Sequence, residues 1–208
     1  MKIIRYGGWE DIDVQFQDGF YYIKEHQTYS NFKKGEIKNP YDKTVFGVVY
    51  VGVGKYKTKE NGCFTIYYQQ WKNMLLRCYV KAERHHAYEN AKVCEEWLNF
   101  QVFAKWYDEH YYEIEESLQI DKDIKYPGNA IYSPQTCILI PQKINLMFTN
   151  KSNNRGLPNG IVKQGEGYLA KYNHIRLGVF NTVEEAYCCQ TKKKKEVIVE
   201  LANEYKDI

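Results

Sequence analysis

The spacing of the apolar residues changes twice along this chain of 208 residues, and that change limits the possible folds more than any single motif. Up to about residue 45, apolar and polar residues alternate, as at Ile12, Val14 and Phe16. From about residue 46 to 150 they recur at helical spacing, and beyond residue 158 short strands lead into one long helix. A chain that carries both periods is expected to be an α+β protein.

Residues 1–45 are expected to form a small β module. Asp18-Gly19 follows the alternating run as a hairpin signal, and the alternation continues through Phe20 and Tyr22. The stretch Phe32–Gly35 predicts a second turn. Residues 151–158 are polar and contain Gly and Pro, so they predict a linker. This divides the rest into a central domain over 46–150 and a C-terminal domain over 151–208.

The central domain is expected to begin with a strand pair punctuated by glycines at positions 47, 52 and 54. Two helices follow, one through Trp71–Cys78 and one through Val93–Tyr107, since apolar residues recur there at i, i+3 and i+4. A stripe of this kind usually faces a core. We therefore expect the two helices to support the unit that follows them, Leu118–Phe148.

This unit is punctuated by Gly and Pro in a way that predicts two short strands, a loop between them and then a short helix. The first strand contains Leu118–Ile120 and the second Cys137–Ile140. The loop turns at Pro127–Asn129. From these residues alone two interpretations stay open, because Asp121 and Asn145 suit a small metal site and the same residues suit an ordinary core hairpin.

The C-terminal domain is expected to contain three short strands, near 160–163, 168–172 and 175–180, followed by a helix from Val183 to about Tyr205. Thr182 at the N-cap and Glu185 three residues later form a capping-box pattern. The basic run at 192–195 is typical of a solvated helix face. The residues expected to face the strands are Ala186, Tyr187, Gln190, Val197 and Leu201.

Composition excludes several classes of protein. A hydrophobic content of 44% excludes global disorder, and no window approaches the roughly 18–20 apolar residues of a membrane span. The first residues are charged and lack the apolar run of a signal peptide, so a cytoplasmic protein is expected. A net charge of +3 requires any nucleic-acid surface to be local. Six cysteines without C-x-x-C spacing predict reduced, buried thiols rather than a zinc site.

Several motifs of the central domain stand together in one order. They are W-x-x-M-L-x-R-C-Y (Trp71–Tyr79), V-C-x-x-W-x-x-F (Val93–Phe100), and then D-K-D-I, G-N, Y-S-P-x-T-C and P-Q-x-I-N within Leu118–Phe148. With these motifs, residues 46–150 resemble the HNH endonucleases of bacteriophages and mobile elements. The N-terminal module resembles, less specifically, the leading module of the same phage proteins.

The resemblance implies a ββα site that holds one divalent cation, Mg²⁺ or Mn²⁺, for phosphodiester cleavage. It implies that Asp121 and Asn145 are the metal ligands and that Asn129 pins the loop through local hydrogen bonds. A catalytic member carries histidine next to the metal-binding Asp, whereas this chain has Lys122. Histidine accepts a proton near neutral pH, whereas a lysine ordinarily stays protonated there. Lys122 is therefore either an unusual catalytic base or a phosphate contact.

The C-terminal domain resembles the DNA-binding domain of plant ethylene-response factors, which also occurs in phage and homing nucleases. The matching elements are Gly160-Ile161, Tyr168-x-Ala170, Leu177-Gly178-x-Phe180 and Thr182-x-Glu184-Glu185-Ala186. The resemblance implies a three-stranded antiparallel sheet that enters the major groove of double-stranded DNA while the helix braces it. The implied DNA contacts are Lys163, Tyr168, Lys171, Tyr172 and Arg176.

Two functions follow from these resemblances and stay open. The first is a metal-dependent HNH endonuclease of phage or mobile-element type, acting in the cytoplasm of an infected or host bacterial cell. The second is a nuclease-inactive DNA-binding protein on the same scaffold, acting in regulation or counter-defence. Lys122 favours the second, and the pair Asp121 and Asn145 favours the first. A protein-binding module is a third class, and no oligomeric state is predicted.

Overall fold

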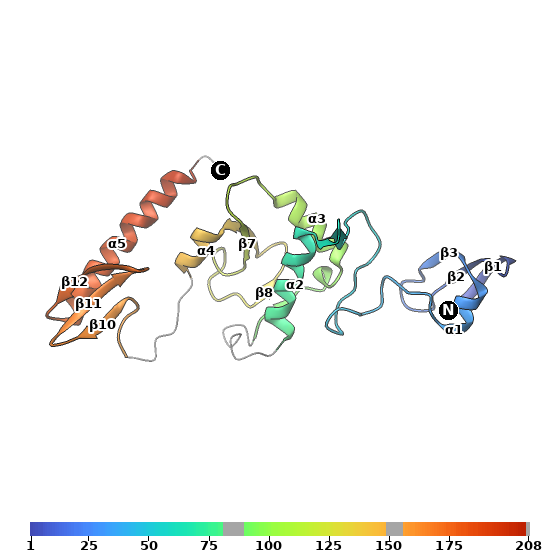
Figure 1. Ribbon diagram of the computed structural model, residues 1–208, viewed down its shortest axis with the longest axis horizontal. Helices are drawn as coiled ribbons and strands as arrows, with labels where there is room; N and C mark the ends of the chain where they lie inside the picture. Colours follow the sequence, from blue (N-terminus) through green and yellow to red (C-terminus); the bar gives the residue numbers. More distant parts are fainter. Residues whose placement is uncertain (81–89, 149–155, 207–208) are drawn as a thin grey trace. The chain divides into compact units, whose positions relative to one another are not determined.

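The computed structural model describes residues 1–80, 90–148 and 156–206, and its elements are mixed α and β, as the sequence predicts (Figure 1). The chain divides into two compact units, Met1–Pro141 and Gln142–Ile208, and each is described by itself. Among the described residues there are three hydrophobic clusters, at the N-terminal sheet, around the central helices and between the C-terminal sheet and its helix.

The N-terminal module contains an antiparallel sheet in the order β1-β2-β3. Its strands are β1 (Lys2–Gly8), β2 (Asp11–Gln15) and β3 (Ile23–Gln27). The three apolar residues of the alternating run at 12, 14 and 16 are all buried, as predicted, but Asp13 between them is buried too and accepts a hydrogen bond from Arg5. They pack with Ile37 and the half-buried Phe32 into one small core.

The turn expected at Phe32–Gly35 is the end of a short helix, α1 (Tyr29–Lys34). The Thr28 hydroxyl caps its first turn by accepting from the Asn31 N–H at 3.2 Å. Gly35 ends it in the left-handed conformation with φ of 70°. A threonine and a glycine at those two positions are helix-capping signals, which the strand-like pattern around them obscured.

The strand pair expected around residues 47–54 does not form. Gly47 and Gly52 adopt φ of 70° and 72°, which interrupts an extended backbone, and only isolated bridges join Val45 to Val49 and Tyr50 to Asn99. The hairpin of this region lies further along, between β4 (Lys59–Glu60) and β5 (Cys63–Phe64). Its turn residues, Asn61 and Gly62, both have positive φ, as an Asn-Gly two-residue turn requires.

The first predicted helix is confirmed as α2 (Ile66–Tyr79), with Trp71, Met74 and Leu75 buried. The second starts later than predicted, as α3 (Phe100–His110), because Asn99 caps it by accepting from the Gln101 N–H at 2.9 Å. Val93 belongs instead to β6 (Lys92–Val93), which pairs in parallel with β8 (Ile131–Tyr132). Trp97 lies in a 3₁₀ turn over Glu96–Leu98.

The strands predicted within Leu118–Phe148 are confirmed. β7 (Leu118–Asp121) pairs in antiparallel fashion with β9 (Ile138–Pro141), and Leu118, Ile120 and Leu139 join the central core. The short helix that follows is α4 (Gln142–Phe148), the first element of the second unit. Among the described helices, none is both long enough and apolar enough to cross a membrane.

The C-terminal module is the predicted three-stranded antiparallel sheet with one helix. Its strands are β10 (Ile161–Gln164), β11 (Gly167–Tyr172) and β12 (Ile175–Phe180), and its helix is α5 (Val183–Glu204) (Figure 1). Ile161, Ala170 and Ala186 form its buried centre.

The capping box at the start of α5 is confirmed, because the Glu185 N–H donates to the Thr182 hydroxyl and the Thr182 N–H donates to the Glu185 carboxylate, both at 3.2 Å. Of the residues expected to face the strands, Ala186 is fully buried, but Tyr187 is 48% exposed. The expectation for Tyr187 is wrong, since one residue corresponds to about 100° around a helix.

Candidate functional site

Asp121 ends β7 and starts the loop to which the sequence assigns metal binding. Its Oδ1 atom accepts the backbone N–H groups of Asp123 at 2.8 Å and of Ile124 at 2.7 Å. This is a local side-chain turn of the kind that Asp makes with the residues after it. At least one oxygen of the predicted ligand is thus committed to holding the loop.

Lys122 is buried, with 7% of the residue exposed. Its Nζ atom donates to both carboxylate oxygens of Asp123, at 2.8 and 2.9 Å, and to the Asn129 carbonyl oxygen at 2.6 Å. It also lies 5.9 Å from the centre of the Tyr132 ring. An ammonium group has three N–H donors, so these bonds account for all of them.

Asn129 closes the same loop from the other side. Its Nδ2 atom donates to the carbonyl oxygens of Lys122 at 3.0 Å and of Ile131 at 2.7 Å, and its Oδ1 atom accepts from the Ile131 N–H at 3.1 Å. These are local hydrogen bonds of the kind that the sequence predicts for Asn129. Side chains of three consecutive polar residues, 121–123, and of Asn129 thereby tie the loop together.

The Y-S-P-x-T-C element is a hydrogen-bonded turn that leads into β9. The Ser133 and Thr136 hydroxyl oxygens lie 2.9 Å apart, and the Cys137 N–H donates to the Ser133 carbonyl oxygen at 3.0 Å. Burial raises the pKa of the Cys137 thiol to about 12, so this thiol stays protonated at neutral pH. The polar residues of this element therefore have a structural role, since they form the turn before β9.

The loop at 121–131 does not fit the water-activating half of a metal-dependent nuclease. Such a site needs a proton acceptor beside the metal ligand. The position beside Asp121 holds an ammonium group whose N–H groups are all hydrogen-bonded. Asn145 lies on α4 in the second unit and is half-buried. Metal ligation by Asp121 and Asn145 together stays a prediction.

A second group of possible metal ligands, not predicted from the sequence, lies on the N-terminal sheet. Ligand atoms of Asp11, Asp13 and His26 fall within 4.8 Å of one another. The group is already occupied by a cation, because the Arg5 guanidinium donates to Asp11 at 2.6 and 2.9 Å and to Asp13 at 2.8 Å. These hydrogen bonds hold the pKa of both carboxyl groups below their usual range.

Two of the predicted DNA contacts lie opposite each other in the C-terminal sheet. Lys171 and Arg176 are paired across β11 and β12, so their side chains share a face. Ala170 packs in the cluster with Ala186 of α5, and Lys171 is half-buried. The pairing of β11 with β12 shifts register between Ala170 and Lys171. Arg176 is exposed and its Nη2 atom donates to Gln164 Oε1 at 3.2 Å.

The other three predicted DNA contacts are Lys163, Tyr168 and Tyr172. Lys163 and Tyr168 are paired across β10 and β11, with the Lys163 ammonium 4.4 Å from the centre of the tyrosine ring. Tyr168 packs against the hydrophobic cluster beneath the helix. Tyr172 is buried, with 8% exposed, and supports the module from within. Lys163 is exposed, and its Nζ atom donates to the Glu166 carbonyl oxygen at 3.1 Å.

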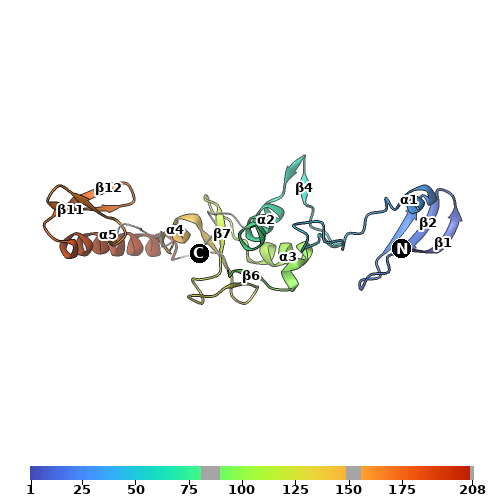
Figure 2. The same ribbon diagram turned by 90° about the horizontal axis from the view of Figure 1, so that it is seen from below.

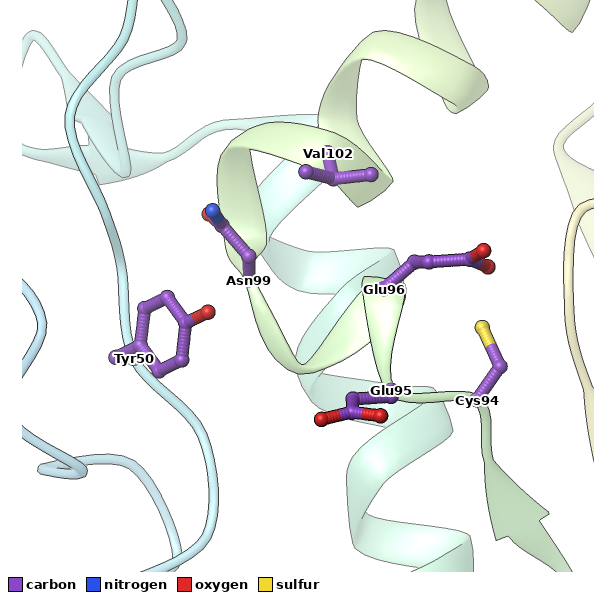
Figure 3. Close-up of a pocket in the computed structure, with 6 residues that line it drawn as sticks. All are labelled: Tyr50, Cys94, Glu95, Glu96, Asn99 and Val102. Atoms are coloured by element: carbon purple, nitrogen blue, oxygen red, sulfur yellow. The ribbon is translucent and has the colours of Figure 1, made fainter. Parts of the chain in front are cut away.

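A pocket of about 480 Å³ lies beside the start of α3, and none of the predicted site residues lines it. Figure 3 shows Cys94 and Glu96 on one side of the short turn, and Tyr50 across from Asn99 on another segment. The lining residues are Tyr50, Cys94, Glu95, Glu96, Asn99 and Val102. Two glutamates without a lysine or arginine in the lining disfavour a phosphate ligand there.

Comparison with known proteins does not assign the chain to a family. The chain matches no protein-family model, and no curated protein and no solved structure shows significant similarity to it.

Proposed function

We propose that this protein binds double-stranded DNA through the outer face of its C-terminal sheet. The observation that carries the proposal is the pair Lys171 and Arg176, which lie directly opposite each other across β11 and β12. A sheet braced by one helix offers a ribbon that the major groove admits, and Arg and Lys are the usual partners of phosphates and of guanine edges.

Of the two functions that the sequence leaves open, the contacts of Lys122 support the nuclease-inactive DNA-binding protein. An HNH enzyme needs a group that takes a proton from water, and the ammonium of Lys122 is held by Asp123 and Asn129 as part of the loop. The proposed role is therefore recognition or blocking of DNA, in regulation or counter-defence, in the cytoplasm of a bacterial cell.

The proposal is tested by replacing Lys171 and Arg176 together with alanine in the full chain. Binding of a short DNA duplex is then measured by fluorescence anisotropy across a salt series. If each side chain neutralises one phosphate, the slope of log affinity against log salt falls by about two, and affinity falls at low salt. If Arg176 contacts a base edge, the part of the affinity loss that is due to Arg176 depends on the DNA sequence.

Lys192→Ala with Lys195→Ala is the matched control. It removes the same charge from the same unit, at two exposed positions of α5. Equal losses for the two double variants would reduce the effect to net charge and contradict the sheet as the binding face. A wild-type chain without affinity for any duplex at 50 mM salt would overturn the proposed function.

A further inference from the structure

The β4–β5 hairpin carries a basic and aromatic cluster that the sequence analysis did not predict. The ammonium groups of Lys59 on β4 and of Lys72 on α2 lie 4.7 Å and 5.4 Å from the centre of one ring, that of Phe64. Phe64 is 48% exposed, so the cluster is part of the protein surface. Figure 2 shows the hairpin projecting beyond α2.

The hairpin is firmly attached to the helix that follows it. Thr65 caps α2 and its hydroxyl donates to the Lys57 carbonyl oxygen at 2.8 Å, while its N–H donates to the Thr58 carbonyl oxygen at 3.1 Å. The Phe64 ring stacks on Tyr68 with centroids 5.1 Å apart. Tyr68 in turn packs against the buried core. The aromatic base of the cluster is therefore held in place by the fold.

The described part of the chain offers no acidic partner to either ammonium group. In residues 1–80, 90–148 and 156–206, no carboxylate lies within 4.0 Å of Lys59 or Lys72. The neighbouring lysine Lys57, by contrast, pairs with Glu60 at 3.8 Å. Two like charges around one ring repel each other, so a shared anion would relieve the repulsion.

We infer that the β4–β5 hairpin, with Lys59 and Lys72 around Phe64, is a second contact surface for the phosphate backbone of double-stranded DNA. This inference rests on the proposed function and extends it to the first unit of the chain. A projecting two-stranded ribbon has a width that the major groove admits. Its uncompensated charges come from lysines, which suit phosphates as point charges rather than reading bases.

The contact is expected to be independent of sequence. Phosphate contacts fix the position of a protein on DNA and carry no direct sequence information. The hairpin therefore contributes affinity equally on unrelated duplexes, while any sequence preference comes from elsewhere in the chain. An acidic protein surface is the competing partner of the same chemistry, and unchanged duplex affinity after removal of both lysine charges would favour it over DNA.

The test uses the full chain with Lys59→Gln and Lys72→Gln, which removes both charges and keeps a polar side chain at each position. Affinity for two unrelated duplexes of equal length is measured by anisotropy over a salt series. We expect a roughly three- to thirty-fold loss at low salt and a log–log salt slope reduced by about two, equal for both duplexes. The pair Lys59→Arg and Lys72→Arg keeps the charges and is expected to retain wild-type affinity.

The control is Lys33→Gln with Lys105→Gln, two exposed lysines distant in sequence from the hairpin, of which Lys105 pairs with Glu109 at 3.7 Å. Unchanged duplex affinity for the Lys59/Lys72 glutamine pair, or a loss no larger than the control's, would overturn the inference and leave the C-terminal sheet as the proposed site. A loss confined to single-stranded DNA would overturn it as well.

Failure of the proposed function and failure of this inference give different affinities for the two double variants. If the Lys171/Arg176 alanine pair binds like the wild type while the Lys59/Lys72 glutamine pair loses affinity, the hairpin is supported and the sheet is not. If the wild-type chain binds no duplex at all, both proposals are wrong.

Discussion

Lys122 and Asn129 bind each other's backbone from opposite sides of one loop. The Lys122 ammonium donates to the Asn129 carbonyl oxygen at 2.6 Å, and the Asn129 side-chain amide donates to the Lys122 carbonyl oxygen at 3.0 Å. The pair thereby joins the end of β7 to the approach to β8. Asp123 completes it by accepting two further hydrogen bonds from the same ammonium. This arrangement yields the first two predictions.

Replacing Lys122 by Met is expected to destabilise the central core by about 1–3 kcal/mol, because the Asn129 carbonyl and the Asp123 carboxylate lose their buried donor. Urea unfolding followed by tryptophan fluorescence measures this, since Trp71, Trp97 and Trp106 lie in that core. Combined with Asn129→Ala, the two substitutions are expected to couple by more than about 0.5 kcal/mol. Lys105→Met, at an exposed position, is the control, and an equal effect there would contradict the structural role.

Replacing Lys122 by His is expected to leave the protein without nicking activity in Mg²⁺ or Mn²⁺. An imidazole cannot supply the three donors that this position uses, so the loop that holds Asp121 loses its support before any base is gained. A supercoiled-plasmid assay of wild type and variant tests this. A general base typically contributes 10²–10⁴-fold, so restored cleavage would be visible on a gel and would revive the endonuclease hypothesis.

Arg5 is expected to make the stability of the N-terminal module depend on pH in the acid range. The Arg5 guanidinium lowers the pKa of the Asp13 carboxyl in the folded protein. A lowered folded-state pKa stabilises above the unfolded pKa of about 3.9, and this contribution is lost as pH falls through the folded value. The stability difference between wild type and Arg5→Ala should therefore be full at pH 6 and shrink steadily below pH 4.

The readout is urea unfolding at a series of pH values, with circular dichroism as the signal for the sheet. Arg5→Lys is the control, because it keeps a positive charge but cannot span two carboxylates with a planar fork. The stability of the Arg5→Lys variant is expected to lie between those of the wild type and Arg5→Ala. A difference between wild type and Arg5→Ala that is independent of pH would show that Asp11 and Asp13 do not depend on this guanidinium.

Thr182→Ala is expected to loosen the first turn of α5, because the capping hydroxyl is lost. Loss of an N-cap costs about 0.5–2 kcal/mol, which corresponds to roughly two- to thirty-fold faster amide exchange in that turn. Hydrogen–deuterium exchange of peptides that cover residues 182–190 measures it. Thr182→Ser keeps the hydroxyl and is expected to exchange like the wild type, and faster exchange in both variants would contradict the capping role.

The sequence by itself determined the elements whose signals are local. The alternation at 12, 14 and 16 predicted β2 because every second side chain of a strand shares a face. Thr182 and Glu185 predicted the start of α5 because both capping bonds lie within four residues. The strands at Leu118–Asp121 and Ile138–Pro141 followed from their bounding turn residues. The Asn61-Gly62 dipeptide is a further local signal, and it marks the turn of the β4–β5 hairpin.

Tertiary structure decided the properties that depend on residues far apart in the chain. Val93 has helical spacing to Trp97, yet pairs as a strand, because β8 supplies its hydrogen bonds from almost forty residues away. Tyr172 is a predicted DNA contact, but its side chain is buried in the C-terminal module. Lys72 becomes part of a basic surface only because the hairpin brings the Phe64 ring and Lys59 to it. Patterns report the period of a segment, whereas burial and charge pairing are set by whatever the fold packs against it.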